Sequence, residues 1–496
     1  MSYRSIVEAV AHHATIIPNK TAIIEGETGR TCTYGELWAY VKVFSEYLSK
    51  AGVAHDFGDG YGTRVVARCA QSIDFVITSL AIQLAGGVFV PVEKRIADTR
   101  IKEIMEETDS TVLVAAKPLT DYACTYIPLS DASVVHNNID DVNTLFPDPN
   151  ALAVILYTTG TTGKSKGVMH STKSSVARVI SYYSAFLHDD QQIWLNPSPL
   201  CHINGLNKTY LSLFYKCTVV LVDGYALAEA FFSSISKYKV TIINLMSAAA
   251  EIYLRTCRDK LIEISEQIKY ICLPASSFTE GQILSLRDIF SNSTIIQTYG
   301  ATEVSGCYIN HTKENRGSFC LGKPREGTDV AFFNEQKTAN INADSKNPGL
   351  IAMNSETKMR GYWKNPVLTA SVTRGEYIIL SDLGYKGEDG LLYFISRADD
   401  VITSGGYKIA PLEIEEIANM FDGIRESACI AIRDPILGEV PKLYVLMNEG
   451  YSFDFSQIYK HMTDKLEATR VPRYIEEIDE IPKINSKINR RELRDI

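Results

Sequence analysis

Helical patterns alternate with short apolar runs along most of this 496-residue chain. The segment TYGELWAYVKVFSEYLSKAG, which ends at Gly52, has the apolar spacing of an amphipathic helix, and the RVVARC run that follows is rich in β-branched residues. The alternation returns in TRIKEIMEETD and TVLVAA, and later in KCTVVLVD, VTIINL and YICLPA. Another helix is predicted after Ser171 or Thr172, with one face formed by Val176, Val179, Ile180 and Tyr183. Alternating helices and strands predict an α/β architecture.

The length of the chain bears on its division into domains. Because 496 residues exceed the usual size of one hydrophobic core, we expect a large multilayer domain and at least one smaller domain. From about Gly349 the pattern changes to short strands and turns, which predicts a β-rich subdomain. After Asp399 the segment VITSGGYKIAPLEIEEIANMF predicts a turn followed by a helix. We place the boundary there, with an N-terminal domain over 1–397 and a C-terminal domain over 398–496.

The charge and the cysteines exclude several kinds of partner. A formal net charge of -9 gives no general attraction for nucleic acid or for an anionic membrane. The local exception is a basic C-terminal tail, with Lys483, Lys487, Arg490, Arg491 and Arg494. The ten cysteines occur singly, without the spacing of a metal site or of a disulfide framework. A reducing cytoplasm is therefore the expected location.

Two segments bear on targeting and membrane insertion. The N-terminus, MSYRSIVEAVAHHATIIPNK, lacks the continuous apolar core of a signal peptide. The longest apolar stretch, IDFVITSLAIQLAGGVFVPV, contains Asp74, Gln83 and a Gly-Gly break. It predicts a buried helix that leads into a buried strand, and no membrane span.

A loop rich in threonine, glycine and lysine lies at 157–168, in the sequence YTTGTTGKSKGV. Only Thr161 and Thr162 separate Gly160 from Gly163, so the spacing of a Walker P-loop is missing, as is the Gly-x-Gly-x-x-Gly pattern of dinucleotide sites. Glycines let backbone N–H groups approach an anion, hydroxyls add donors, and Lys166 adds a positive charge. Taken alone, the loop fits a phosphate site and an ordinary surface turn equally well.

Five further motifs follow this loop. They are YGATE at 299–303, GYWKNP at 361–366, SDLGYKGEDG at 381–390, SRADDVITSGGYKIAPLEIE at 396–415 and PKINSKINR at 482–490. In this order the six motifs resemble those of the adenylate-forming enzymes, which comprise acyl- and aryl-CoA ligases, the adenylation domains of nonribosomal peptide synthetases, and luciferases. The resemblance covers nearly the whole chain. It is specific because chance matches do not also preserve order and spacing.

The resemblance implies a fold and a reaction. The fold is a large N-terminal domain of two α/β subdomains and a β-rich subdomain, followed by a small mobile α+β domain. In the reaction, a carboxylic acid and ATP·Mg²⁺ give an acyl-adenylate and pyrophosphate, and the thiol of coenzyme A then forms the thioester with release of AMP. Because a carboxylate must attack a charged α-phosphate, the protein must supply cations and hydrogen-bond donors. We therefore expect an AMP-forming acid–thiol ligase.

The resemblance also implies the residues that bind the nucleotide. The loop would hold the β- and γ-phosphates through Thr158, Thr159, Gly160, Thr161, Thr162, Gly163 and Lys166. Glu303 would bind Mg²⁺ together with Thr158, since a hard ion prefers oxygen ligands. In the same YGATE motif, Thr302 would donate to a phosphate, and Tyr299 beside Gly300 would offer a flat face to adenine.

The ribose would be held by Asp382, which can accept from two vicinal hydroxyls, and by Arg397 on the opposite side. Structural alternatives remain open for three of these nucleotide-site residues. Glu303 could be a solvated loop residue, Tyr299 a core residue, and Asp382 a residue that fixes a turn.

Lys487 in PKINSKINR is the residue expected to carry chemistry. By the resemblance it reaches the substrate carboxylate and the α-phosphate and stabilises the charge that develops between them. The alternative is a solvated basic tail or a nucleic-acid patch, which the acidic balance of the chain disfavours. His202 in PLCHING matches the family position beside the acid, although a lone histidine is often only a core residue.

The resemblance further implies that the small domain rotates about Asp399, two residues beyond Arg397. Rotation would withdraw Lys487 and bring the turn with Gly405 and Gly406 to the site, where the lack of side chains leaves room for the pantetheine arm. For the Gly-Gly pair a plain turn is the alternative.

Several positions depart from the family pattern. Ser165, Ser381, Ser396 and Ser486 replace a Pro and three Gly residues, and LPASS at 273–277 replaces a Gly-Gly-Ala segment of the acid pocket wall. None of these changes removes a functional group. The segment NPSPLCHINGLN has no acidic residue to pair with an α-ammonium, so an aromatic or medium-length aliphatic acid is favoured over an amino acid.

Two other functions are compatible with parts of this sequence. One is loading of the acid onto the phosphopantetheine of a carrier protein instead of coenzyme A. The other is a nucleotide-binding regulator without catalysis, which the retention of Lys166, Glu303, Asp382, Arg397 and Lys487 disfavours.

Overall fold

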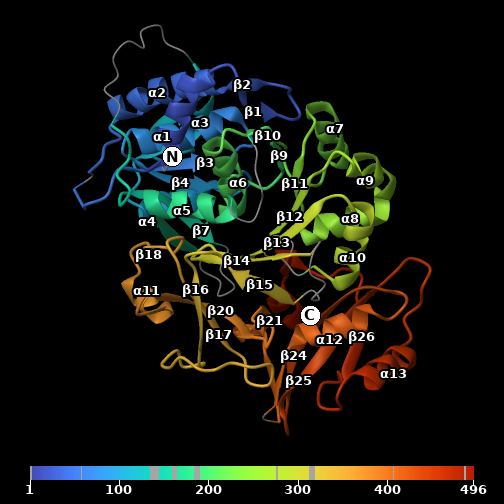
Figure 1. The fold of residues 1–496 in the computed structure, drawn as a ribbon. Helices are drawn as coiled ribbons and strands as arrows, with labels where there is room; N and C mark the ends of the chain where they lie inside the picture. The colour runs from blue at the N-terminus through green and yellow to red at the C-terminus, as the bar shows by residue number, and fades with distance from the viewer. Residues whose placement is uncertain are drawn as a thin grey trace.

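The computed structural model describes residues 3–56, 58–134, 145–158, 165–183, 190–274, 278–311, 319–405, 407–484 and 487–496. A large α/β domain is followed by a small domain at the C-terminal end of the chain (Figure 1). Two extended sheets form the framework of the large domain, and a third forms the centre of the small one. The predicted fold class is confirmed. Among the described helices, none combines the length and the apolar character needed to cross a bilayer.

The first sheet contains the strand that leads into the Thr/Gly/Lys loop. In spatial order its strands are β18 (Gly361–Tyr362), β8 (Lys166–Ser171), β7 (Leu152–Thr158), β4 (Val88–Val92), β3 (Arg64–Arg68), β5 (Val112–Ala115) and β6 (Thr125–Pro128). The strands from β7 to β6 pair in parallel, whereas β8 and β18 run antiparallel to their neighbours. The loop thus connects two adjacent antiparallel strands.

The second sheet begins with an α/β part. Its strands are β2 (Thr31–Thr33), β1 (Thr21–Glu25), β10 (Thr218–Leu221), β9 (Ile193–Asn196), β11 (Ile242–Asn244), β12 (Tyr270–Pro274) and β13 (Thr294–Gly300). All neighbours from β1 to β13 are parallel, as expected for a sheet covered by helices.

The same sheet continues into an antiparallel part. These strands are β14 (Ser305–Asn310), β15 (Cys320–Pro324), β21 (Leu392–Arg397), β20 (Tyr377–Lys386), β17 (Gly349–Asn354) and β16 (Asp329–Phe333), with β19 (Thr373–Arg374) paired to β20. The β-rich subdomain predicted from about Gly349 is therefore an extension of the α/β sheet, and it joins that sheet at β13 and β14.

Helices fill the space between the two sheets and cover their outer faces. One apolar core joins residues of both sheets to the helices α1 (Ile6–Ile16), α2 (Tyr34–Lys50), α3 (Ile73–Leu84) and α6 (Ile203–Phe214). Helix α4 (Asp98–Glu107) covers the outer face of the first sheet. The outer face of the second sheet is covered by α7 (Ala228–Tyr238), α8 (Ser247–Thr256), α9 (Arg258–Ser265) and α10 (Glu280–Ile289) (Figure 1).

The apolar stretch at 73–92 and the segment after Ser171 both form the elements predicted from the sequence. The longest apolar stretch forms helix α3 and then strand β4, as predicted. The helix after Ser171 is α5 (Thr172–Tyr183), and the Ser171 hydroxyl accepts a hydrogen bond from the Ser174 N–H group at 3.1 Å. Its buried stripe contains Val176 and Val179 as predicted.

The predicted apolar face of α5 was partly wrong. Ile180 is 43% exposed, and Arg178 lies in the core although the apolar pattern omitted it. The buried face of α5 therefore includes Arg178 together with Val176 and Val179. Ile180, which is about 100° further round the helix than Val179, lies outside this face. The side chain of Tyr183 lies outside the described residues.

The small domain has a sheet with strands β23 (Tyr407–Ile409), β22 (Ile402–Ser404), β25 (Gly438–Met447) and β24 (Ile424–Asp434), and β26 (Tyr474–Glu477) pairs with β25. Helices α12 (Pro411–Asn419) and α13 (Phe455–Lys465) pack on one face. On the other face lie Ile481 and the short helix α14 (Arg490–Arg494). The segment after Asp399 is thus a β-hairpin followed by a helix, where the sequence predicted only a turn before the helix.

Candidate active site

The YGATE motif forms a tight turn where the α/β part of the second sheet meets its antiparallel part. Tyr299 and Gly300 end strand β13, and Ser305 begins β14. A Cβ atom on Gly300 would lie 2.5 Å from the Ser305 Cβ atom, so only glycine fits at this position. The turn is therefore compact, and it presents Thr302 and Glu303 between the two strands.

Tyr299 connects this turn to the predicted ribose pair. Its hydroxyl donates to Asp382 Oδ2 at 2.7 Å. Asp382 on β20 lies directly opposite Arg397 on β21, with Arg397 Nε 3.8 Å from Asp382 Oδ1. Burial and the nearby Asp382 carboxylate raise the pKa of Tyr299 well above its usual value, so the hydroxyl stays protonated and remains a donor. The carboxylate keeps capacity to accept further hydrogen bonds, as a ligand for vicinal hydroxyls requires.

Glu303 and Lys166 both lie near Tyr362. The Tyr362 hydroxyl donates to Glu303 Oε1 at 2.8 Å, and Lys166 Nζ lies 5.7 Å from the centroid of the Tyr362 ring. Lys166 is paired with Thr158 across the hairpin of β7 and β8. Thr158 and Glu303, the two predicted ligands of Mg²⁺, are thus both connected to Tyr362, Thr158 through its strand partner Lys166 and Glu303 through a hydrogen bond. The other predicted loop residues, Thr159, Gly160, Thr161, Thr162 and Gly163, lie outside the described residues.

Tyr362 is a site residue that the sequence reasoning missed. It belongs to GYWKNP, one of the six family-like motifs, for which the sequence predicts no individual site residue. The sequence signal that could have indicated Tyr362 is its position directly after Gly361 inside this motif.

Two buried side chains, Arg178 and His170, hydrogen-bond to the backbone of the YGATE turn. The Thr302 carbonyl accepts from Arg178 Nη2 at 2.6 Å and from His170 Nε2 at 2.9 Å. Burial, reinforced by the charge of Arg178, holds the pKa of His170 well below its usual value, so the ring is neutral and carries its proton on Nε2. Burial also lowers the pKa of Arg178, to about 10, which leaves it charged at neutral pH. Neither contact could be predicted from the sequence.

His202 lies apart from these two groups, at the position just before helix α6. Its Nε2 atom is 3.5 Å from Glu93 Oε1, and 31% of its side chain is exposed. Burial lowers the pKa of His202, and the Glu93 carboxylate opposes this effect. A neutral, partly exposed imidazole can take or give a proton, or hydrogen-bond to a carboxylate. The pocket-wall segment LPASS is described only as far as Pro274.

The predicted hinge and glycine turn lie on the small-domain side. Asp399 is exposed in a short 3-10 turn, η2 (Ala398–Asp400), immediately after β21. Gly405 has a φ of 56°, in the left-handed region that favours glycine, and its N–H group donates to the Leu437 carbonyl at 2.8 Å. Gly406 lies outside the described residues.

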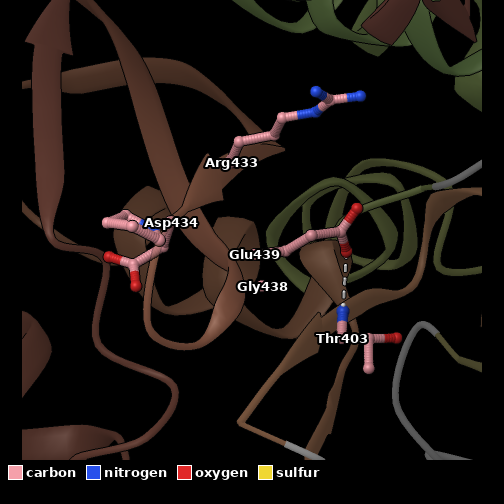
Figure 2. A pocket seen from close by; sticks show the side chains of 6 residues that line it. Thr403, Arg433, Asp434, Gly438 and Glu439 are labelled. Atoms are coloured by element: carbon pink, nitrogen blue, oxygen red, sulfur yellow. Dashed lines mark hydrogen bonds between the residues drawn. The ribbon is translucent and has the colours of Figure 1, made fainter.

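A pocket opens beside this turn. Figure 2 shows Glu439 accepting a hydrogen bond from the Thr403 N–H group, at 2.9 Å, with Arg433 on the same side and Asp434 directed away. The pocket lies on the small-domain sheet and so would move with the glycine turn.

Lys487 begins strand β28 (Lys487–Ile488), which pairs with β27 (Lys483–Ile484). Two of its neighbours in the tail pair with carboxylates of the small domain. Lys483 Nζ lies 2.8 Å from the Glu426 carboxylate, and the largely buried Arg490 binds Glu415 at 2.5 Å. The largely buried Arg490 is therefore not part of a solvated basic patch, whereas Lys483 is exposed and pairs with Glu426 at the surface of the small domain.

Comparison with known proteins places these features in a family. The model of the AMP-binding enzyme family matches residues 10–363, and the model of the AMP-binding enzyme C-terminal domain matches residues 413–487. The chain is 26% identical to a 2-succinylbenzoate–CoA ligase of Geobacillus kaustophilus, over 97% of this chain and 96% of that one. It is 25% identical to a feruloyl-CoA synthase of Amycolatopsis, with the same coverage of 97% and 96%.

Solved structures show the same fold. The structure of an ATP-bound MatB from Rhodopseudomonas palustris matches with a TM-score of 0.88 at 20% identity, over 99% of this chain and 98% of that chain. An O-succinylbenzoate coenzyme A synthetase of Bacillus subtilis, in complex with ATP and magnesium, matches with a TM-score of 0.85 at 22% identity, over 98% and 99%. The resemblance inferred from the six motifs is confirmed. Because the first family model covers residues 10–363 of 496, the chain belongs to the AMP-binding enzyme family.

Proposed function

We propose that this protein is an ATP-dependent acyl- or aryl-CoA ligase, which activates a carboxylic acid as its adenylate, releases pyrophosphate and transfers the acyl group to coenzyme A. One observation carries the proposal. Tyr299, Asp382 and Arg397 form one hydrogen-bonded and charged group, Lys166, Tyr362 and Glu303 form a second, and the YGATE turn joins them. The first group suits a ribose and the second suits a charged phosphate chain.

In the adenylation step, the residues of the chain bind the nucleotide, orient the reacting groups and neutralise phosphate charge. Asp382 accepts the ribose hydroxyls, with Arg397 opposite, and so fixes the nucleoside. Lys166 supplies positive charge next to the phosphates. Lys487 is the proposed donor to the carboxylate and the α-phosphate, and His202 is the proposed neighbour of the acid. No protein nucleophile is needed, because the adenylate is itself the activated intermediate.

The residues around Glu303 fit a magnesium ion. Tyr362 bonds one of the two carboxylate oxygens, and no hydrogen bond within the described ranges occupies the other. Carboxylate and hydroxyl oxygens are ligands that Mg²⁺ accepts, usually alongside phosphate oxygens of the substrate. Mg²⁺ bound by Glu303 and Thr158 would neutralise charge on the departing pyrophosphate.

The acid and the acceptor remain predictions. The similar ligases are named for different acids, 2-succinylbenzoate and ferulate, so their names do not fix the acid used here. The sequence favours an aromatic or medium-length aliphatic acid. A carrier-protein thiol is the alternative to coenzyme A, and a cytoplasmic location is still an expectation.

The test is pyrophosphate release from ATP across a panel of aromatic and aliphatic acids, with coenzyme A, with a phosphopantetheinylated carrier protein, and with neither. We expect release with at least one acid and thioester formation with coenzyme A. Asp382→Asn should raise the KM for ATP. Asp389→Asn is the matched control, because Asp389 also accepts a hydrogen bond from a tyrosine hydroxyl, that of Tyr393, and it should leave the KM for ATP unchanged. Nucleotide binding without release with any acid would support the regulator instead.

A further inference from the structure

Helix α4 ends beside a sequence motif that forms part of the candidate site. The backbone carbonyl of its last residue, Glu107, accepts a hydrogen bond from the indole N–H group of Trp363, in GYWKNP, at 2.8 Å. The carbonyl of a last helical residue has no partner within the helix, so a donor from outside satisfies it. Two residues later, Asp109 pairs with Lys364 Nζ of the same motif at 2.6 Å. The end of α4 is thus fixed to the segment that follows Tyr362.

The side chain of Glu107 also reaches β7, the strand that leads into the Thr/Gly/Lys loop. Arg100, two turns earlier in α4, donates to Glu107 Oε1 at 2.8 Å, and its guanidinium carbon lies 5.6 Å from the centroid of the Tyr157 ring. The Tyr157 hydroxyl is hydrogen-bonded to the Glu107 carboxylate. Burial and the charge of Glu107 raise the pKa of Tyr157, so the hydroxyl keeps its proton and is the donor. One glutamate therefore joins Tyr157 of one motif to Trp363 of another.

Tyr157 and Trp363 also approach one backbone position on β8, that of Gly167. A Cβ atom on this glycine would lie 3.4 Å from Tyr157 Cζ and 3.3 Å from Trp363 Cβ. The Trp363 N–H group donates to the Gly167 carbonyl at 2.8 Å. Gly167 directly follows Lys166 in the strand. The two aromatic residues bound by Glu107 therefore pack against the strand that carries Lys166.

The hairpin formed by β7 and β8 carries two of the residues proposed to bind the outer phosphates and Mg²⁺. Thr158 follows Tyr157 and pairs with Lys166 across the hairpin. A donor or a positive charge stabilises a phosphate only when it is held in the right place, and a displacement of about 1 Å has a large effect on such an interaction. Helix α4 supplies a fixed support for the hairpin, because its buried face packs in the core of the first sheet.

We propose that Glu107 is a positioning residue of the phosphate site: it fixes Tyr157 and, through it, the hairpin that brings Lys166 to the β- and γ-phosphates of ATP. The inference rests on the proposed function and adds to it a residue that acts through another. Its effect is specific to ATP, because AMP lacks the two outer phosphates. Loss of the bond between Tyr157 and Glu107 should weaken the binding of ATP by roughly 5- to 20-fold.

The test measures the dissociation constants of ATP·Mg²⁺ and of AMP by calorimetry for the wild type, Glu107→Ala, Tyr157→Phe and the double variant. Glu103→Ala is the matched control, because Glu103 lies on the same helix and also pairs with Arg100 at 2.8 Å. We expect both single variants to lose affinity for ATP, and to keep the AMP affinity and melting temperature of the control. The double variant should lose no more than the weaker single variant, because both substitutions remove the same bond. Glu107→Gln should recover most of the affinity, since its amide oxygen can still accept from the hydroxyl.

Equal losses of affinity for ATP and AMP would indicate a general structural role and would overturn the proposal, as would unchanged ATP binding in the single variants or additive losses in the double variant. If Glu107→Ala does not fold, Tyr157→Phe alone decides. The ligase function is judged separately, by pyrophosphate release. If no acid releases pyrophosphate but the wild type binds ATP, the ligase function fails and the affinities still decide the role of Glu107. A wild type that binds neither nucleotide would overturn both.

Discussion

Replacing Tyr362 with phenylalanine removes one hydroxyl from the centre of the candidate site. That hydroxyl donates to Glu303 Oε1 at 2.8 Å, and burial together with the Glu303 charge raises the pKa of Tyr362, so it is a donor at every working pH. A hydrogen bond to a charged group contributes about 1.5–3 kcal/mol, which corresponds to roughly 10- to 150-fold in an equilibrium constant. Residues that orient a metal ligand typically change metal affinity or activity by about 10- to 100-fold.

We therefore expect Tyr362→Phe to need at least about tenfold more Mg²⁺ for half-maximal pyrophosphate release. The ring remains, so its contact with Lys166 and the packing of β18 should be kept, and the melting temperature should change little. The assay is pyrophosphate release as a function of Mg²⁺ at saturating ATP and acid.

Tyr393→Phe is the matched control for this experiment. The Tyr393 hydroxyl, on β21 of the second sheet, also donates to a carboxylate at 2.8 Å, that of Asp389, and lies outside both groups of the candidate site. The reasoning is refuted if Tyr362→Phe keeps the Mg²⁺ dependence of the wild type, or if both variants shift it equally.

Three further predictions concern catalysis, motion and acid stability. Lys487→Ala should slow adenylate formation by roughly 100-fold or more, while thioester formation from supplied acyl-AMP stays nearly unchanged, and equal losses in single-turnover assays would contradict its assigned role. Asp399→Pro, which fixes φ at the proposed hinge, should slow thioester formation much more than adenylation, and similar losses in both steps would argue against rotation. Burial lowers the pKa of His311 from 6.5 to about 4, so below pH 6.5 the unfolded chain binds a proton that the folded chain does not, and stability falls as the pH drops toward 4. His311→Gln should reduce the loss between pH 7 and pH 5 by about 2 kcal/mol in denaturant titrations, and an unchanged loss would show that the group is not responsible.

Much of the local structure could be predicted from the sequence, because apolar spacing is a local signal. The helix that ends before Gly52 and the strand RVVAR formed as expected. The pairing of strands was not predictable in the same way, since it depends on contacts between distant segments. The pairing of β1 with β10, nearly two hundred residues away in the chain, has no local signature.

At the candidate site, individual residues could be predicted from the sequence more readily than the contacts between them. Tyr299, Glu303 and Asp382 could be chosen from their motifs, but the bond from Tyr362 to Glu303 joins two different motifs, and neither motif indicates the other. Arg178 was missed for a physical reason. A charge within an amphipathic pattern predicts a solvated face, and only the fold shows that the Thr302 carbonyl lies there to receive it.

The anchoring of the C-terminal tail links the predictions for Lys487 and Asp399. Arg490 is held by the Glu415 carboxylate at 2.5 Å and by the Cys429 carbonyl at 3.1 Å, and Lys483 is held by Glu426. Lys487 lies between these two anchors, so its backbone moves with the small domain and has little freedom of its own. If Lys487 were on a loose tail, it could reach the large domain whatever the angle at Asp399. Because it is anchored, we expect its access to the nucleotide to depend on that angle, so that a substitution at Asp399 should change the access of Lys487 as well.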